Sequence, residues 1–515
     1  MILVMVGSII LPTMSFIKRF RKDDKVYLAE VENKKINGKV VQRYIRYIGK
    51  EANGRIVLST SISDVQVDQV KLYGPLMVLN TLAEEIGLSD HLGEYGNEIL
   101  SMVYAHCLDF KSINQMETWF EKTDLNMILD LEGLTEERLL DAMDSLEKQD
   151  AEILQRNIFK SVKKKYRLKD SGILYDVTNT YLYGRKCPLG KLGHDKEGVK
   201  GRPLIQIGLG VTKNEGIPVF HKVFDGNIHD SRTFQDWISS FPKYGMKPGG
   251  LFIYDRGITS GKNLLDVKNM KWDTLCGIAF NEKLKTLWRP IAGKKDWVQF
   301  ENRVRLNKTI FYSIAKPYMI DGIKGVLALC FNEQQKRDLK ESRYDEISYA
   351  QELLNDHKKI KPGLEKYFDR RGKLNMSKLT ETEEFDGYCC LFCTCQLQKE
   401  EMIRFYFDKD LIEKAFRSLK GITNLQPIRH WLYQRVIAHV FICYLSYLLL
   451  SLLKYRLRKI QVSPEEALRE LDTMYKVYLK DSENTFKISR VVTLTKKQEN
   501  ILKTINKKLL VVGSE

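Results

Sequence analysis

The sequence predicts an α/β protein whose core is a mixed β-sheet covered by helices. Between residues 172 and 280, three strand-like apolar runs follow one another, and later strands then alternate with amphipathic segments in the order β-β-β-α-β-α-β. Consecutive strands can form an antiparallel meander, whereas strands joined by helices pair in parallel, so the sheet should be mixed. With 515 residues, 43% of them hydrophobic, the chain can bury sizeable cores in more than one domain.

The chain before this core divides into three predicted segments. Residues 1–14 are apolar, lack a positively charged start and are too short to span a bilayer, so we expect a non-structural extension. Residues 15–65 predict a small β unit, because two alternating β-branched runs flank a turn. Residues 66–165 have helical periodicity and end in the basic run Lys163–Lys165, which fits a solvated helix face and a DNA-backbone contact equally well.

Residues 166–280 hold the first part of the predicted core. A helix should begin near Ser231, where polar capping residues precede apolar residues at helical spacing. A second helix and a fifth apolar strand complete this part. The first four strands are expected at 172–180, 203–212, 218–227 and 249–257.

The remaining chain contains an interruption and the end of the core. Residues 281–385 combine β-like runs with a highly charged helical stretch and predict an inserted, β-rich domain. Residues 386–460 complete the core with a strand and an amphipathic helix around Glu413. Residues 461–515 are predicted to form a helical, basic C-terminal region.

Three acids stand out against this framework. Asp176 and Asp255 are expected at the ends of apolar strands, at the rim of the sheet, where ligands usually bind in α/β folds. Taken singly, each fits a turn or cap residue. Glu413 lies opposite the apolar stripe of its helix, where Lys409 and Glu413 would otherwise form an ordinary i, i+4 pair on a solvated face.

The conjunction of the three carboxylates favours a metal site. Hard oxygen ligands suit divalent cations such as Mg²⁺, with Mn²⁺ as a substitute. Two such ions about 3.5–4 Å apart can activate an attacking oxygen and stabilise a leaving oxygen in phosphodiester cleavage. The formal net charge of +17 points to a polyanionic partner, and nucleic acid is the leading candidate.

The segment from Tyr406 to Lys420 resembles the Y-(2)-R-(3)-E-(6)-K pattern of the "insertion sequence 4" superfamily of DDE transposases. Tyr406, Glu413 and Lys420 match the pattern. Lys409 stands where the pattern has arginine, so the charge is kept but bidentate phosphate recognition is lost. The resemblance extends from about Ser15 to the apolar helix near residue 453.

This resemblance implies an RNase H-like core and a DNA transposase. Metal-dependent cleavage at the terminal inverted repeats would free a 3′-OH, which would attack target DNA. The partners would be double-stranded DNA, through residues 66–165 at the element's ends, and a second copy in a homodimer, in the bacterial cytoplasm at the nucleoid. The implied metal ligands are Asp176, Asp255 and Glu413, and the implied DNA-contacting residues are Tyr406, Lys409 and Lys420. Arg417, on the same helix face as Glu413, is expected to bind a DNA phosphate as a cationic neighbour.

Two other functions are compatible with the sequence. The Lys409 departure leaves room for a catalytically inactive, transposase-derived DNA-binding protein. The uncharged run Val436–Leu453 is long enough for a marginal membrane span, which would suit a membrane-associated basic protein. We expect a buried helix there and no membrane contact, because the preceding sequence has the pattern of a globular α/β unit.

Weaker candidate sites have simpler explanations. The cysteines at 389, 390, 393 and 395 contain one CxxC without a partner pair, so a buried strand is favoured over a zinc site. His229 and Asp230 fit a loop and helix cap. His194 and Asp195 lie in a Gly/Lys-rich loop that could touch DNA or simply connect two strands.

Overall fold

The computed structural model divides into two compact units. It describes residues 15–22, 25–36, 39–52, 55–58, 65–184, 186–199, 201–292, 294, 296–481 and 487–510, so the predicted extension 1–14 lies outside the described residues. The terminal unit comprises the described residues within 1–74, 122–124 and 470–515, and the core unit comprises the described residues within 75–121 and 125–469. All the acids and cations predicted for the site belong to the core unit.

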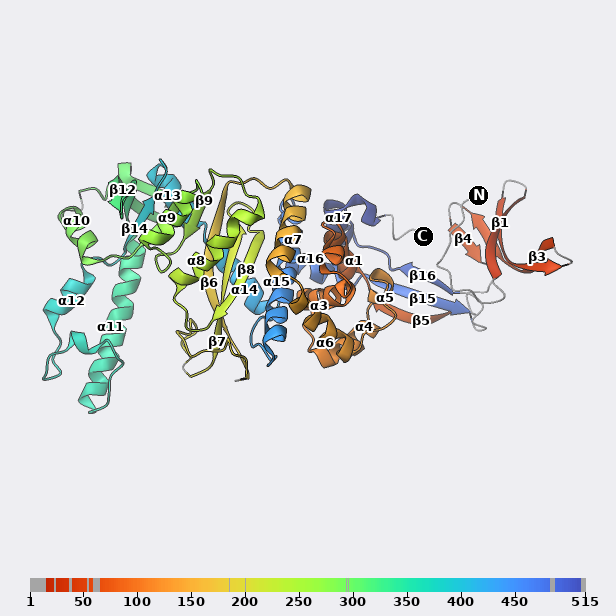
Figure 1. Ribbon diagram of the computed structural model, residues 1–515, viewed down its shortest axis with the longest axis horizontal. Coiled ribbons are helices and arrows are strands. Elements are labelled where there is room, and N and C mark those ends of the chain that lie inside the picture. Colours follow the sequence, from red (N-terminus) through yellow and green to blue (C-terminus); the bar gives the residue numbers. More distant parts are fainter. Residues whose placement is uncertain are drawn as a thin grey trace. The chain divides into compact units, whose positions relative to one another are not determined.

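The terminal unit contains two antiparallel sheets (Figure 1). Leu28, Ala29 and Val31 of β2 are buried, so one part of the first sheet has an apolar core. The β-rich pattern of residues 15–65 is therefore present in the described strands. The first sheet has the order β1 (Ser15–Lys22), β2 (Lys25–Ile36), β3 (Lys39–Ala52), β4 (Arg55–Leu58), and the second has the order β16 (Lys487–Val491), β15 (Tyr475–Asp481), β5 (Val65–Leu72).

The prediction of a helical region over 461–515 is only partly correct. Helices α16 (Pro464–Leu471) and α17 (Lys496–Ile505) are present, but β15 and β16 lie between them. The sequence YKVYLKD of β15 contains two tyrosines and a valine, residue types that favour a strand. Strand β15 pairs with β5, from Tyr475↔Leu72 to Asp481↔Val65, a partner too distant in the chain for local periodicity to reveal.

The core unit begins with a helical segment whose ends are satisfied locally. Asp150 accepts hydrogen bonds from two backbone N–H groups at the start of α7. At its end, Lys163 lies 2.7 Å from Asp170 and donates to the Gly245 carbonyl, so this residue of the basic run serves the fold. The helices are α1 (Gly74–Glu84), α2 (Leu88–Leu92), α3 (Gly96–Leu108), α4 (Met116–Glu121), α5 (Leu125–Ile128), α6 (Glu136–Ser145) and α7 (Ala151–Tyr166).

The described core residues form one nine-stranded mixed sheet in the order β11-β12-β13-β14-β10-β9-β6-β7-β8. Strands β6, β7 and β8 form the predicted antiparallel meander, and β9 and β10 pair in parallel beside β6. The mixed α/β core is therefore confirmed. The strands are β6 (Gly172–Tyr181), β7 (Leu204–Thr212), β8 (Pro218–Asp225), β9 (Leu251–Tyr254), β10 (Asp273–Ile278), β11 (Arg303–Leu306), β12 (Thr309–Ile320), β13 (Ile323–Phe331) and β14 (Tyr388–Cys393).

The segment predicted as an insertion adds its strands to the same sheet. Strand β13 pairs with β14, which in turn pairs with β10. The charged stretch is the long helix α11 (Glu333–Asn355), which extends from the sheet with α12 (Met376–Glu383) in Figure 1. A small core of its own holds this part together, made of Ile347, Ala350, Leu364, Tyr367 and Leu379.

Helices pack against both faces of the sheet, and neighbouring residues of β6 face different helices. Tyr175 contacts Thr233 and Trp237 of α8 (Asp230–Ser240). Successive side chains of a strand point to opposite faces, so Asp176 points to the other face, where α14 (Asp410–Gly421) packs against β6 and β7. The other helices around the sheet are α9 (Gly261–Asn269), α10 (Glu282–Ala292) and α13 (Lys399–Phe407).

The apolar run predicted as a buried helix is α15 (Tyr433–Leu457). It is long and apolar enough to cross a membrane, but 94% of its most apolar window is buried inside the protein. Tyr444 and Tyr447 donate hydrogen bonds to the carbonyls of Val219 and Gly216, beside β8. The helix thus packs against β8 as a central element of the core unit, as the sequence predicted.

A glycine in β7 makes the packing of α8 against the sheet sensitive to one methyl group. A Cβ at Gly210 would lie 2.1 Å from Trp237 Cζ2, and Trp237 is itself stacked on Phe220. We therefore expect Gly210→Ala to lower the free energy of unfolding by about 1–3 kcal/mol, measured by urea denaturation followed by tryptophan fluorescence. Gly133→Ala, which meets nothing within 4 Å, is the control. Equal stability of the two variants would contradict this packing argument.

Candidate active site

The register of two parallel strands sets Asp176 beside Asp255. Tyr175 is paired with Tyr254, and each acid is the next residue of its chain. Neighbouring strands lie about 4.8 Å apart, so the two carboxyl-bearing positions are adjacent. One detail of the prediction is wrong: Asp176 is not at a strand end, because β6 continues to Tyr181 through its pairing with β7.

The environment of Asp176 penalises its negative charge. Desolvation raises the pKa of this carboxyl to about 6, and the negative charge of Asp255 acts in the same direction. Lys196, the Val177 N–H and Lys409 oppose that rise. The Val177 N–H donates to Asp176 Oδ1 at 2.8 Å. Even so, Asp176 lacks full charge compensation from the protein alone.

Asp255 is better compensated. Partial burial raises its pKa, but Lys409, the Tyr406 hydroxyl and the Arg256 N–H outweigh burial and hold the pKa below its usual range. Tyr406 donates to Asp255 Oδ1 at 2.7 Å, and the Arg256 N–H donates to the same oxygen at 2.8 Å. Asp255 is therefore an ionised, oriented carboxylate whose side chain remains 42% exposed.

Helix α14 presents Glu413 opposite its buried face. Ile412, Ala415, Phe416 and Leu419 are buried, as the apolar stripe predicted, while the Glu413 side chain is 52% exposed. Helix α13, which carries Tyr406, ends at Phe407, and Lys409 is the residue that precedes α14. A short connection thus fixes Tyr406, Lys409 and Glu413 relative to one another.

Lys409 lies between two of the acids. Its Nζ is 3.3 Å from Asp255 Oδ2 and 3.7 Å from Glu413 Oε1. Among the described residues, Asp176, Asp255 and Glu413 do not form a group whose carboxylate oxygens all lie within 4.8 Å of one another. An ammonium group therefore supplies the positive charge that joins Asp255 and Glu413 in this structure.

Arg417 and Lys420 have other partners. Arg417 is 71% exposed and lies 3.4 Å from Asp410 at the start of its own helix. Lys420 Nζ lies 3.4 Å from Glu197 Oε1, and Glu197 also accepts a hydrogen bond from Gln426. The structure thus places Tyr406 and Lys409 against the acids, and Arg417 and Lys420 on the same helix but in separate ion pairs.

Lys196 is a charged neighbour that the sequence reading missed. It comes from the Gly/Lys-rich loop between β6 and β7, donates to the Val177 carbonyl and lies 3.9 Å from Asp230. The charge pattern of that loop was the only signal, and it did not indicate which lysine turns inward. Lys196 also lines a cavity of about 350 Å³ with Asn179, His194, Gln206 and Asp230.

Several of the weaker candidate residues have structural partners in the fold. His229 is the N-cap of α8, where its ring accepts from the Ser231 N–H. Asp195 pairs with Arg202 at 2.6 Å and orders the loop. The four clustered cysteines lie in or just after β14, and none belongs to a group of metal-binding side chains within the described residues.

The donor chemistry fits divalent cations. Three carboxylates offer the hard oxygen ligands that Mg²⁺ and Mn²⁺ accept. The raised pKa of Asp176, caused first by desolvation, shows a carboxylate that would gain from a nearby cation. Lys409 would have to yield its place between Asp255 and Glu413 when such an ion binds.

Comparison with known proteins identifies a family. The model of the transposase DDE domain family matches residues 167–449, more than half of the 515 residues. No curated protein matches the chain. A cryo-EM structure of the piggyBac transposase synaptic complex with hairpin DNA is similar at 10% identity and a TM-score of 0.40, covering 78% of this chain and 80% of that one.

The raised pKa of Asp176 predicts a pH-dependent cost. Its pKa is about 6 in the folded protein and 3.8 in the reference state, so folding binds a proton between these values. Stability therefore falls as pH rises from about 4 to 6, and the whole penalty is present above pH 6. Asp176→Asn removes this penalty. At pH 7.5, with a chelator present to remove metal ions, we expect the substitution to raise the free energy of unfolding by about 1–2 kcal/mol.

Urea denaturation across pH 4–8 measures this effect. The gain should shrink to a small fraction near pH 4, because the unfolded state then also begins to bind the proton. Glu333→Gln, which removes an exposed carboxylate at the start of α11, is the control for charge alone. A gain in stability of equal size at every pH would contradict a raised pKa of Asp176.

Proposed function

This chain belongs to the family of transposases with a DDE domain, and we propose that it cuts and joins DNA with Asp176, Asp255 and Glu413 as its metal ligands. The observation that carries the proposal is the meeting of three chain segments. Strand β6 and the end of β9 bring Asp176 and Asp255 together, and α14 adds Glu413 through the bridge of Lys409.

Transposase domains of this family generally depend on divalent metal ions, and we propose Mg²⁺, with Mn²⁺ as a substitute. When bound, such ions would activate an attacking oxygen and stabilise a leaving oxygen at a phosphodiester. Asp176, Asp255 and Glu413 would hold them. The side chains of Asp255 and Glu413 are 42% and 52% exposed, so these two acids are open to a DNA strand from solvent.

The protein's own groups prepare this site. The Tyr406 hydroxyl fixes one oxygen of Asp255 and leaves the other facing Lys409. While no other cation is present, the single positive charge of Lys409 offsets part of the negative charge of Asp255 and Glu413 and lowers the repulsion between them. Once released from them, its ammonium can bind a DNA phosphate as a point charge, without the two parallel hydrogen bonds of an arginine.

DNA is the proposed partner on chemical grounds. The excess of 83 Lys and Arg over 66 Asp and Glu suits a polyanion. Lys420 and Arg417 lie on the helix of Glu413, and their present partners are exposed or half-exposed acids that phosphates could replace. We propose that the DNA comprises the terminal inverted repeats of an insertion sequence and a target, bound by a homodimer at the bacterial nucleoid.

The direct test is cleavage of a labelled duplex that carries the element's own ends. With Mg²⁺ or Mn²⁺, the wild type should nick the transposon end and join the freed 3′-OH to target DNA. Asp176→Asn, Asp255→Asn and Glu413→Gln should each reduce nicking to background, because each removes a ligand charge with little change in shape.

Glu333→Gln, in α11, should retain wild-type cleavage. Binding of the ends without nicking by the wild type, under conditions that keep it folded, would instead support the inactive DNA-binding alternative. Lys409→Arg addresses that alternative further, because it restores the arginine of the family pattern. Nicking that appears only in Lys409→Arg would show that Lys409 has inactivated this copy.

A second experiment tests the phosphate contact of Lys420. Lys420→Ala should weaken binding to specific and unrelated duplexes alike and should lower the slope of log K against log salt by about one. Fluorescence anisotropy between low and moderate salt measures the slope. Lys324→Ala, which removes an exposed lysine of β13, is the matched control and should leave it unchanged. An unaltered slope in Lys420→Ala would remove this residue from the interface.

A further inference from the structure

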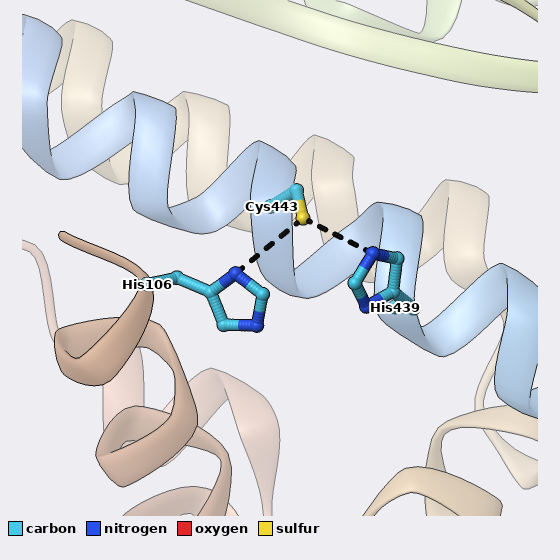
Figure 2. Close-up of side chains that lie close together, drawn as sticks. All are labelled: His106, His439 and Cys443. Carbon is cyan, nitrogen blue, oxygen red and sulfur yellow. Dashed lines mark hydrogen bonds between the residues drawn. The ribbon is translucent and has the colours of Figure 1, made fainter. Parts of the chain in front are cut away.

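A second group of metal-binding side chains lies between two helices of the core unit. Figure 2 shows His106 of α3 and His439 and Cys443 of α15 pointing toward one another. Their ligand atoms all lie within 4.8 Å of one another, and within the described residues this is the only such group of three. Only 6% of each histidine is exposed, and Cys443 is fully buried.

The spacing of these atoms matches ligands of one tetrahedral ion. Cys443 Sγ lies 3.7 Å from His106 Nδ1 and 3.8 Å from His439 Nε2. Zinc binds sulfur at about 2.3 Å and imidazole nitrogen at about 2.0–2.1 Å, so two such ligands at a tetrahedral angle lie roughly 3.6 Å apart. His439 and Cys443 are four residues apart on one helix, which places both on the same face.

The backbone turn after α14 completes the surroundings of the group. The Thr423 carbonyl oxygen lies 2.5 Å from His106 Nδ1 and 3.4 Å from Cys443 Sγ. The His439 ring also lies against the His106 ring, with ring centroids 5.5 Å apart, so the two imidazoles face each other across the group.

We propose that His106, His439 and Cys443 bind one Zn²⁺ ion. The Thr423 carbonyl oxygen, which now lies at hydrogen-bond distance from His106 Nδ1, would become the fourth donor after moving away from that nitrogen. Two imidazoles and a thiolate suit zinc better than Mg²⁺, which prefers oxygen ligands. Binding would form the Zn–S bond as the Cys443 thiol releases its proton to solvent, and His106 would carry its own proton on Nε2. No electron transfer is involved, and the closed, buried position makes the ion structural.

This ion would fasten three parts of the core unit. Helix α3 belongs to the helical segment that precedes the sheet, and α15 packs against β8 and α14. Thr423 lies two residues after the end of α14, the helix that carries Glu413. A zinc ion bound here would therefore fix the C-terminal end of α14 and, through this helix, the position of Glu413. The ion itself would contact neither DNA nor the three acids.

The competing arrangement contains no metal. In it, His106 Nδ1 and the Cys443 thiol both donate to the Thr423 carbonyl, and the cluster is an ordinary buried polar network. Cobalt spectroscopy separates the two arrangements, because Co²⁺ bound to a thiolate shows a sulfur-to-metal charge-transfer band. The experiment uses the full-length chain with Glu413→Gln, which removes one carboxylate from the site of the three acids.

We expect one equivalent of Co²⁺ to produce the charge-transfer band together with intense visible bands of tetrahedral cobalt, and Zn²⁺ to displace it. Cys443→Ser should abolish the charge-transfer band. Cys107→Ser is the matched control, since Cys107 is also buried on α3 but its thiol donates to the Ser446 carbonyl. Absence of the band in the parent chain, or its persistence in Cys443→Ser, would overturn the proposal.

A second measurement keeps the proposal testable if Cys443→Ser does not fold. The sample is the full-length Glu413→Gln chain without a change at Cys443, treated with a chelator that is then removed. Added Zn²⁺ should raise its Tm by several degrees, because the ion binds the folded state alone. Mg²⁺ at the same concentration should not reproduce that rise. Equal shifts with both ions, or none with Zn²⁺, would reject the zinc site, whether or not the three acids catalyse DNA cleavage.

Discussion

The parallel pairing of β6 with β9 is the constraint on which the site depends. It places Asp176 and Asp255 on neighbouring strands, so two negative charges meet at the border of an apolar sheet. Burial at this border, together with the nearby charge of Asp255, raises the pKa of Asp176. Positive groups close to Asp176 offset part of that rise. Lys196 reaches this acid from the loop after β6, and Lys409 reaches it from the start of α14.

The same constraint explains the unequal treatment of the two acids. Asp255 follows the last residue of β9, where Tyr406 and a backbone N–H can reach one oxygen. Asp176 lies inside β6, where the pairing with β7 continues and only its own strand supplies a backbone donor. One carboxylate is therefore ionised and oriented by the protein, whereas the other carries a cost that a bound cation would offset.

Helix α15 links this site to the rest of the core unit. Its tyrosines hydrogen-bond to the backbone around β8, and its other contacts reach α3, α6 and α14. Gln155 of α7 pairs with both backbone groups of His221 on the edge strand β8, which protects that edge from other strands. Helix α15 thus contacts both the edge strand β8 and α14, the helix of Glu413. The proposed zinc ligands lie on α15 itself and on its neighbour α3.

The sequence by itself determined the elements of the core and the approximate place of the acids. Alternation predicted β7, apolar runs predicted β6 and β9, and the stripe from Ile412 to Leu419 predicted which face of α14 is buried. These features are local, because strand and helix periodicity follow from side chains close together in the chain. The chemical roles of Asp176, Asp255 and Glu413 remain predictions that rest on residue type and family pattern.

Only the tertiary structure decided the contacts between distant segments. It pairs β5 with β15, adds β11–β13 to the core sheet and sets Lys196 against the carbonyl of Val177, the residue after Asp176. It also brings His106 to His439 and Cys443, although more than three hundred residues separate them. Periodicity states which face of an element is buried but not what covers it, because that choice depends on packing across the whole folded chain.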